Sequence, residues 1–328
     1  MLDIPLRVGI AGNGKFARGV EFQVRHAEGM ELVWRQEPDD VEAYLKNQPV
    51  DAFVEACGNV HDGAECSLLA IENHAHVILT NPRVDVAYGL PIQTEAFQEG
   101  IVVTSDIGTP HGALASMIQE AHFMGFNIVQ AGQISPRSEP TQLIYEMAAL
   151  ANGFGFLPPD GGMPGSKVGA IDDALDVFHS EKHESPPQIN VIECADGRSR
   201  IYLIVTPRDE ADEEQVAHLR NCQLGDGPYY LLSRNAPLGH LETPKTILGA
   251  VAGQAILSPG HPTCDVYAAL AQDLPSGSEL AESLLSPQLL PRDESLVPFV
   301  AAIEETALRT SLRAGEKVTF LNALRTPE

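Results

Sequence analysis

The chain has 328 residues and a formal net charge of −24, with 45 Asp and Glu residues against 21 Lys and Arg residues. A chain of this length is expected to form two or three domains. The excess of negative charge argues against a nucleic-acid partner and against an anionic membrane surface, since both require a basic face. If the substrate is anionic, the few cations must gather at its site.

The first residues show no charged stretch followed by a long apolar run, and no later segment reaches transmembrane length. We therefore expect a cytoplasmic protein that has no membrane partner. The 5 cysteines are odd in number and widely scattered, which favours reduced thiols over a disulfide framework or a zinc cluster. We predict no structural metal. The cysteines are Cys57, Cys66, Cys194, Cys222 and Cys264.

The first predicted element is a short apolar strand, residues 6–11, which leads directly into a glycine-rich turn. The turn has the G-x-G-x-x-A spacing of a dinucleotide-binding site. Gly12 permits the tight turn, Gly14 lets backbone N–H groups approach a pyrophosphate, and Ala17 lets the following helix pack closely on the strand. A glycine-rich turn that binds nothing is the alternative. The predicted cofactor residues here are Gly9, Gly12, Asn13, Gly14, Lys15, Phe16 and Ala17.

Strand-like and helix-like stretches then alternate up to about residue 134, which is typical of a doubly wound parallel sheet with helices on both faces. Ligands bind at the carboxyl ends of the strands in such sheets. Cys57, Gly58 and Asn81 follow strands and are therefore predicted to lie near the cofactor, Cys57 as a packing residue. The predicted strands are residues 6–11, 30–35, 51–55, 77–80, 102–104 and 127–131.

The segment after the second strand is short, so the adenosine pocket is expected to be abbreviated. A carboxylate at this point usually holds the ribose hydroxyls of NAD, whereas an arginine accepts the additional phosphate of NADP. Glu37 therefore favours NAD and Arg35 favours NADP, so the two residues give opposite indications of the cofactor. We include Arg35 among the cofactor residues and favour NADP, with NAD left open.

Three domains are predicted: a Rossmann dinucleotide-binding domain over residues 1–133, an α+β substrate and dimerisation domain over 134–258, and a small β-rich module over 259–328. In the second domain, residues 189–194 and 200–205 are predicted to form a hairpin around Asp196-Gly197. In the third, residues 265–270 and 318–321 are predicted strands and 300–308 a helix.

Several short motifs in this order resemble the homoserine-dehydrogenase-like oxidoreductases that carry a C-terminal SAF domain, a family that includes the deoxyxylulose-phosphate reductoisomerase-like enzyme. The resemblance implies a homodimer, an SAF-like third domain, and NAD(P)-linked chemistry on a small hydroxylated or phosphorylated metabolite. The motifs are the glycine turn from Gly9 to Gly19, Glu55-Ala56-Cys57-Gly58, His76-Val77 with Asn81, Tyr145-Glu146-Met147-Ala148 with Ala151-Asn152-Gly153, Leu224-Gly225-Asp226-Gly227-Pro228-Tyr229, and His240-Leu241-Glu242 with Pro244.

The chain departs from this family at several points. The segment after the second strand is shorter than usual, and Gly108-Thr109-Pro110 and Gly162-Met163-Pro164-Gly165 lack polar groups that the family carries. Arg83 stands where an acidic residue is frequent, which suggests a different or more anionic substrate.

Hydride transfer requires a group that gives or takes a proton, and Asn81 cannot do so at neutral pH. Glu146 and Glu242 stand in apolar surroundings and need partners, either a structural ion pair or cap or a substrate hydroxyl. His240 could act as an acid or base, or be a structural histidine. For the lysines a solvated surface charge is the alternative. The candidate catalytic residues are Glu146, His240, Glu242, Lys245 and Lys167.

His179 and His183 are four residues apart, as metal ligands on a helix can be, but no third ligand is near and a polar helix end is favoured. The sequence as a whole predicts an NAD(P)-dependent oxidoreductase that transfers a hydride to or from a small anionic or hydroxylated molecule. The alternatives are a reductoisomerase-like enzyme acting on a sugar phosphate and a catalytically inactive scaffold that binds a cofactor.

Overall fold

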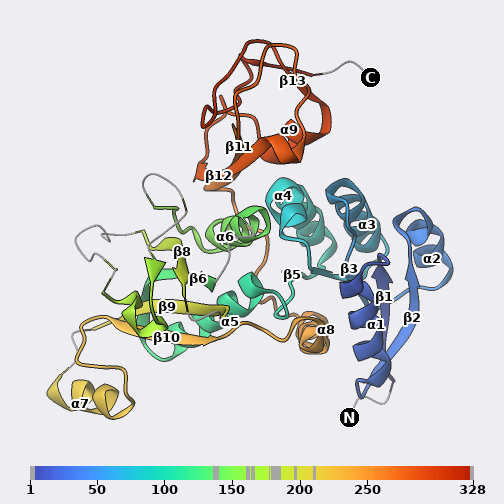
Figure 1. Cartoon of the computed structure of the whole chain (residues 1–328). Coiled ribbons are helices and arrows are strands. Elements are labelled where there is room, and N and C mark those ends of the chain that lie inside the picture. Colours follow the sequence, from blue (N-terminus) through green and yellow to red (C-terminus); the bar gives the residue numbers. More distant parts are fainter. Residues whose placement is uncertain are drawn as a thin grey trace.

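A computed structural model describes residues 4–135, 140–159, 163, 167–176, 178, 186–195, 198–209 and 212–325. Two five-stranded sheets lie side by side, and a small C-terminal module sits beyond them (Figure 1). None of the helices in these ranges is both long enough and apolar enough to cross a membrane.

The first sheet is parallel throughout and has the strand order β2-β1-β3-β4-β5. This confirms the predicted doubly wound α/β fold, with the first five predicted strands close to their expected positions. The sixth predicted strand, residues 127–131, forms but belongs to the second sheet. The order reverses between β1 and β3, which is where such sheets bind ligands. The strands are β1 (Leu6–Ala11), β2 (Met30–Gln36), β3 (Ala52–Glu55), β4 (His76–Leu79) and β5 (Val103–Ser105).

Apolar side chains on alternate positions of these strands cover both faces of the sheet. Val8, Ile10 and Val54 pack with helix α1 (Lys15–His26) and helix α8 (Thr243–Val251) on one face. The opposite face packs with α2 (Val41–Asn47), α3 (Val60–Glu72) and α4 (Pro82–Glu99). Burial of both faces explains why the strands read as continuous apolar runs.

The connection between β2 and β3 consists only of the 3-10 turn η1 (Pro38–Asp40) and α2. The chain returns at once to the far side of β1, so β2 is the edge strand of this sheet as far as the structure describes it. The short segment after the second predicted strand therefore corresponds to a sheet that, among the described residues, has a single strand, β2, beyond β1.

Three helices begin where strands of this sheet end, and each has a side-chain cap. Asn59 caps α3, Asn81 caps α4, and Thr109 caps α5 (Pro110–Phe123) by accepting hydrogen bonds from first-turn backbone N–H groups. The caps fix the direction in which each helix leaves the carboxyl edge of the sheet.

The second sheet is mixed and has the order β10-β9-β6-β8-β7. The predicted hairpin is wrong: β8 and β9 both form, but each pairs with β6, which lies between them. Asp196 and Gly197 lie outside the described residues. The strands are β6 (Phe126–Ser135), β7 (Lys167–Val168), β8 (Gln188–Cys194), β9 (Arg200–Pro207) and β10 (Tyr230–Asn235).

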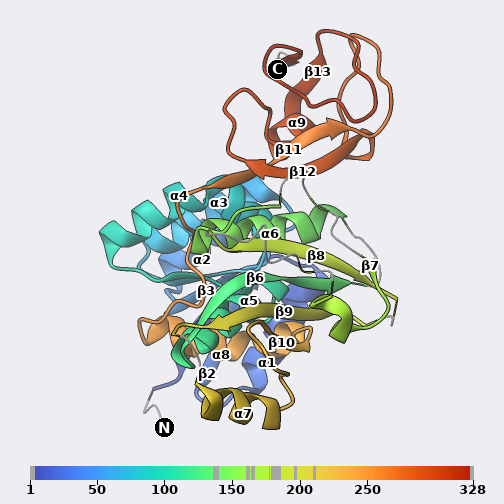
Figure 2. The same ribbon diagram turned by 90° about the vertical axis from the view of Figure 1, so that its left-hand side faces the viewer.

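Helix α6 (Pro140–Phe154) lies between the second sheet and the C-terminal module (Figure 2). The Asn152 side chain holds the chain entering that module, because its Oδ1 accepts hydrogen bonds from the backbone N–H groups of Thr263 at 2.9 Å and Cys264 at 3.1 Å. The Arg83 guanidinium pairs with Glu282 of the module at 2.7 Å and lies over the Tyr145 ring. Arg83 thus joins the module to α4 and α6.

The module contains β11 (Cys264–Leu270) paired with β12 (Leu285–Pro291), and β13 (Thr306–Leu308) paired with β14 (Ala323–Arg325). Helix α9 (Phe299–Glu305) confirms the predicted helix, although it ends earlier. The predicted strand over residues 318–321 is wrong. The chain there makes only isolated bridges, at Lys317 and Thr319.

A buried carboxylate fastens α8 to the first sheet. Asp106, just after β5, accepts hydrogen bonds from the hydroxyls of Thr243 and Thr246, both at 2.6 Å. The Thr246 hydroxyl also accepts a hydrogen bond from the Ile107 N–H at 3.1 Å. Burial raises the pKa of Asp106, and the threonine hydroxyls act in the opposite direction. Helix α8 therefore belongs to the first sheet, although it follows the second sheet in the chain.

Replacing Thr246 with valine keeps the shape of the side chain but leaves Asp106 and the Ile107 N–H each short of a partner. We expect the free energy of unfolding to fall by about 2–3 kcal/mol, measured by urea denaturation. Thr94→Val, at an exposed position on α4, should change it by less than about 0.5 kcal/mol. Equal effects of the two substitutions would contradict the anchoring role of Thr246.

Candidate functional site

The glycine-rich turn between β1 and α1 has the geometry that a dinucleotide requires. Gly12 has φ +114°, and a Cβ there would lie 2.2 Å from the carbonyl oxygen of Ala56, so only glycine fits. Gly14 precedes α1, and a Cβ on it would meet no atom within 4 Å. Ala17 is fully buried against the sheet. The turn therefore leaves open space beside Gly14, at the N-terminus of α1 and at the strand-order reversal, which is the space that a bound pyrophosphate would need.

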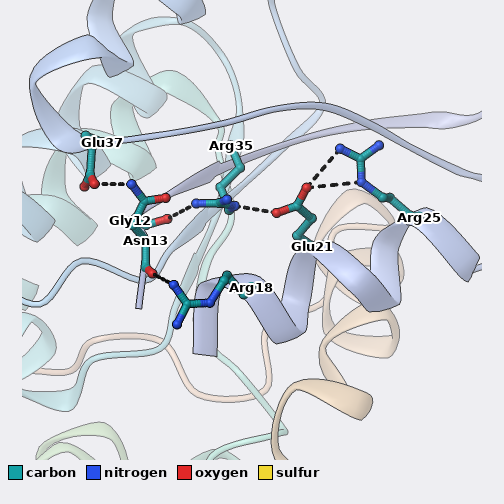
Figure 3. A network of polar contacts seen from close by, with 7 residues as sticks. All are labelled: Gly12, Asn13, Arg18, Glu21, Arg25, Arg35 and Glu37. Carbon is teal, nitrogen blue, oxygen red and sulfur yellow. Dashed lines mark hydrogen bonds and ion pairs between the residues drawn. The ribbon is translucent and has the colours of Figure 1, made fainter. Parts of the chain in front are cut away.

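Polar side chains brace the turn from outside (Figure 3). Arg18 donates a hydrogen bond to the carbonyl oxygen of Asn13 at 2.7 Å, and Arg35 donates one to that of Gly12 at 3.3 Å. The Asn13 side-chain amide donates to the Glu37 carboxylate. The Arg35 and Glu37 side chains, which the sequence sets against each other, thus both reach the same turn.

A second carboxylate joins the ends of β3 and β4. Glu55 is fully buried and accepts hydrogen bonds from the backbone N–H groups of Cys57 at 2.9 Å, Asn81 at 3.1 Å and Thr80 at 3.3 Å. Burial raises the pKa of Glu55 to about 7, although these hydrogen bonds oppose the shift. Glu55 therefore holds the two strand-end loops that carry the predicted cofactor residues.

Sequence reasoning named the loop of Glu55 but not the side chain itself. The available signal was a single acidic residue closing an otherwise apolar strand, which burial makes costly unless donors surround it.

Around Glu55, Gly58 is exposed, and a Cβ there would meet no atom within 4 Å. Cys57 is buried, and its hydrogen bond with Cys66 and its burial raise the pKa of the thiol. Asn81 is half-buried, and its Oδ1 accepts from the Arg83 N–H at 3.1 Å. The loops thus bring Gly58 and Asn81 to the same edge as the glycine turn.

Of the candidate catalytic residues, His240 lies directly against helix α1. It lies in the 3-10 turn η4 (Gly239–Leu241), with its ring 6.2 Å from that of Phe16. A Cβ on Gly19 would lie 2.5 Å from the His240 ring, so the imidazole packs directly on α1. Phe16 and His240, predicted for different roles, are thus in contact.

Glu146 and Glu242 both have the partners that their apolar surroundings demand. Glu146 is 6% exposed on α6 and accepts hydrogen bonds from Gln133 at 2.6 Å and Gln142 at 3.3 Å. Glu242 accepts from the Leu238 N–H at 3.1 Å and lies 4.0 Å from Arg234. Glu242 braces its own turn, whereas Glu146 lies beneath the second sheet.

The two lysines are on the surface. The Lys167 side chain is 80% exposed on the edge strand β7 and pairs with Glu193 at 2.8 Å. Lys245 is exposed on the first turn of α8. The structure brings neither lysine to the glycine turn.

A histidine that the sequence analysis passed over lies close to the end of β5. His111, on the first turn of α5, is 1% exposed, and burial lowers its pKa to about 3, so the ring is neutral. Its Nε2 is 3.4 Å from the Thr109 hydroxyl, while Nδ1 has no hydrogen-bond partner among the described residues. A histidine directly after a strand-end Thr-Pro pair was the signal.

The described part of the chain contains no candidate metal site. No group of three or more His, Cys, Asp or Glu side chains there could hold a metal ion. His179 and His183 lie outside the described residues.

Comparison with known proteins finds a similarity in the middle of the chain. Residues 138–243 match the protein-family model described as "Oxidoreductase DRL, catalytic domain". This segment begins just before α6 and ends at the first residue of α8, so it spans the middle of the chain and includes Glu146, Lys167, His240 and Glu242. A search of curated proteins gave no match.

Solved structures resemble the chain only distantly. A putative oxidoreductase from Magnetospirillum magnetotacticum is 14% identical, with 76% of this chain and 93% of that chain covered and a TM-score of 0.45. A scyllo-inositol dehydrogenase from Lactobacillus casei is 10% identical, with 76% and 90% covered and a TM-score of 0.43. A putative NADPH-dependent oxidoreductase from Desulfitobacterium hafniense is 11% identical, with 77% and 89% covered and a TM-score of 0.44.

Asp85 is a buried carboxylate beside the carboxyl edge of the first sheet. It lies on α4 and accepts a hydrogen bond from the Ser105 hydroxyl at 3.3 Å. Burial raises its pKa from 3.8 to about 7. Between these pH values the Asp85 carboxyl is ionised in the unfolded chain but still protonated in the folded chain. The contribution of Asp85 to the free energy of unfolding therefore falls as the pH rises through this window, and it is constant above the window.

Asp85→Asn removes this titration and keeps an acceptor for Ser105. Relative to the variant, we expect the wild-type free energy of unfolding to fall by up to about 4 kcal/mol between about pH 4 and pH 8. Urea denaturation at a series of pH values measures both. Asp39→Asn, at an exposed position on η1, is the control and should keep the wild-type slope.

Proposed function

We propose that the protein is an NAD(P)-dependent oxidoreductase that transfers a hydride to or from a small hydroxylated or phosphorylated molecule. One observation carries the proposal: the open glycine turn at the start of α1, at the point where the strand order reverses. The match of residues 138–243 to an oxidoreductase catalytic domain supports it. The homoserine-dehydrogenase-like subtype, the SAF-like module, a homodimer and a cytoplasmic location are parts of the same proposal.

The residues present suit a dinucleotide. The N–H groups of Gly14 and of the first turn of α1 would hold the pyrophosphate, with the helix dipole adding to the attraction. Gly58 and Asn81, held in place by Glu55, would line the nicotinamide end. When bound, the nicotinamide supplies or accepts the hydride. The side chains that this chain contributes must then bind the substrate and move one proton.

His240 and Glu146 are the candidates for that proton. His240 packs on Phe16 at helix α1, and an imidazole is a side chain that enzymes use as a general acid or base. Glu146 is buried in the matched segment and accepts hydrogen bonds from two glutamines. Enzymes place catalytic carboxyl groups in buried, hydrogen-bonded positions of this kind. We infer that the substrate lies beneath the cofactor, between the loop over residues 152–165 and the segment over residues 225–242. Residues 160–162, 164 and 165 of that loop lie outside the described residues.

For the cofactor we favour NADP over NAD. Arg18 and Arg35 flank the carbonyl groups of Gly12 and Asn13, and Lys15 is exposed on the same turn. In a chain with a net charge of −24, cations gathered at one turn favour an anionic ligand there.

Gly14→Asp tests the proposed site. The new side chain meets open space, so the fold should survive, but its carboxylate would face the pyrophosphate. We expect the affinity for NADPH and for NADH to fall at least about tenfold, equivalent to about 1.4 kcal/mol, in a titration followed by nicotinamide fluorescence.

Gly14→Ala is the matched control, because it adds the Cβ without the charge, and it should weaken binding less. Both variants should keep the wild-type thermal midpoint. Unchanged binding by Gly14→Asp would contradict the site. If the wild-type protein binds neither nucleotide, the proposed function fails and the scaffold alternative takes its place. A requirement for a divalent cation during turnover would instead favour the reductoisomerase-like alternative.

A further inference from the structure

Arg35 stands where a dinucleotide on this turn would place its adenosine ribose. It is near the carboxyl end of the edge strand β2, paired in register with Ile10, and the next residue, Gln36, accepts a hydrogen bond from the Gly12 N–H at 2.7 Å. The ribose lies over this strand end in dinucleotide-binding sheets, where an arginine accepts the 2′-phosphate that distinguishes NADP from NAD.

The Arg35 guanidinium is already engaged with a carboxylate of the protein itself. Its Nε donates to Oε2 of Glu21, on α1, at 2.5 Å (Figure 3). Both side chains are 22% exposed, so solvent screens this pair only in part. The hydrogen bond from Arg35 is the main reason that the pKa of Glu21 is held below its ordinary value, so Glu21 is ionised at neutral pH.

Glu21 itself joins two arginines. Its Oε1 accepts hydrogen bonds from Arg25 at 2.9 Å and 3.2 Å, one turn further along α1. Arg25 is more exposed, at 56%, and lies on the side of Glu21 away from the glycine turn. The carboxylate is therefore fixed between two guanidinium groups, and only the one from Arg35 also contacts the turn.

We propose that Glu21 sets the preference between NADPH and NADH by acting as an internal anion that competes with the 2′-phosphate for Arg35. The proposal rests on the proposed function, since it needs a dinucleotide on the glycine turn. While Glu21 holds Arg35, the charge of the guanidinium is largely neutralised, and a 2′-phosphate gains little from it. NADH carries a neutral 2′-hydroxyl at this position, so its affinity depends much less on the charge of the pair.

Two other charged side chains, one of each sign, lie near Arg35 at the glycine turn. Arg18 donates to the Asn13 carbonyl on the opposite side of the turn and adds positive charge. Glu37 accepts a hydrogen bond from Asn13 and adds negative charge next to the ribose position. Neither contacts the Arg35–Glu21 pair in the described structure, so substitution of Glu21 changes the state of Arg35 and leaves these two in place.

Glu21→Gln is the direct test, because glutamine keeps the length and helix propensity of the side chain and removes its charge. We expect the Kd for NADPH to decrease about tenfold and the Kd for NADH to change less than about twofold, both from fluorescence titration. The ratio of the two constants is the readout, because a purely structural role of Glu21 would move both constants together.

Two comparisons isolate the effect. Glu42→Gln removes the same charge from another exposed ion pair, with Lys46 on α2, and should leave the ratio unchanged. Arg35→Gln should weaken NADPH binding only slightly, since Glu21 already engages the guanidinium, and adding Glu21→Gln to that variant should have no further effect on the ratio, since the two residues act through one contact. If Glu21→Gln impairs folding, Glu21→Asp, too short to keep the same contact, should shift the ratio in the same direction.

The outcomes separate the two proposals. Binding of neither nucleotide by the wild-type protein overturns both. Binding of both nucleotides with a ratio that Glu21→Gln leaves unchanged overturns only the role of Glu21, as does a shift of the ratio that persists in the absence of Arg35.

Discussion

Two buried carboxylates, Glu55 and Asp106, hold together the loops and the helix at the carboxyl edge of the first sheet. Glu55 binds backbone N–H groups from the loops after β3 and β4, and Asp106 binds two threonine hydroxyls from α8. A carboxylate buried in this way is costly unless nearby donors compensate it. The loops around each one are therefore constrained to present their donors inward, and the shape of the edge follows from that constraint.

The sheet order explains why the charges around the glycine turn matter so much. Within the described residues the sheet ends at β2, so the outer side of the proposed adenosine position has no further strand to supply contacts. What the structure describes on that side is the end of β2 itself and the exposed side of α1. In the proposed site, a few long side chains from those two elements, which hydrogen-bond to one another, would recognise the outer half of a dinucleotide.

Local chemistry in the sequence predicted the first sheet well. The Gly12–Ala17 spacing and the apolar runs are short-range signals, and each is a direct consequence of backbone geometry. The need of Glu146 for partners was also readable, because an unpaired carboxylate in an apolar helix would be unstable. Its particular partner on β6, Gln133, could not be read, because that contact depends on tertiary packing.

Long-range pairing was the main source of error. Residues 189–194 and 200–205 are strands, yet β6 lies between them, and no local signal reports that a strand some 60 residues earlier in the chain takes the central place. The stretch 318–321 has the composition of a strand but makes only isolated bridges. The Arg83 contact with Glu282 joins residues 199 positions apart, so its role in holding the C-terminal module was equally invisible.

The position of α8 has a consequence for how the chain is assembled. This helix completes one face of the first sheet, yet the whole second sheet intervenes between it and β5. In topological terms the second sheet is an insertion into the fold built on the first sheet. The two ends of the insertion are tied together, because Asp106 at the exit and Thr243 at the return share a hydrogen bond of 2.6 Å. The fold of the first sheet cannot be complete until the chain has been made at least as far as residue 251, so one face of that sheet stays uncovered until the second sheet has been synthesised.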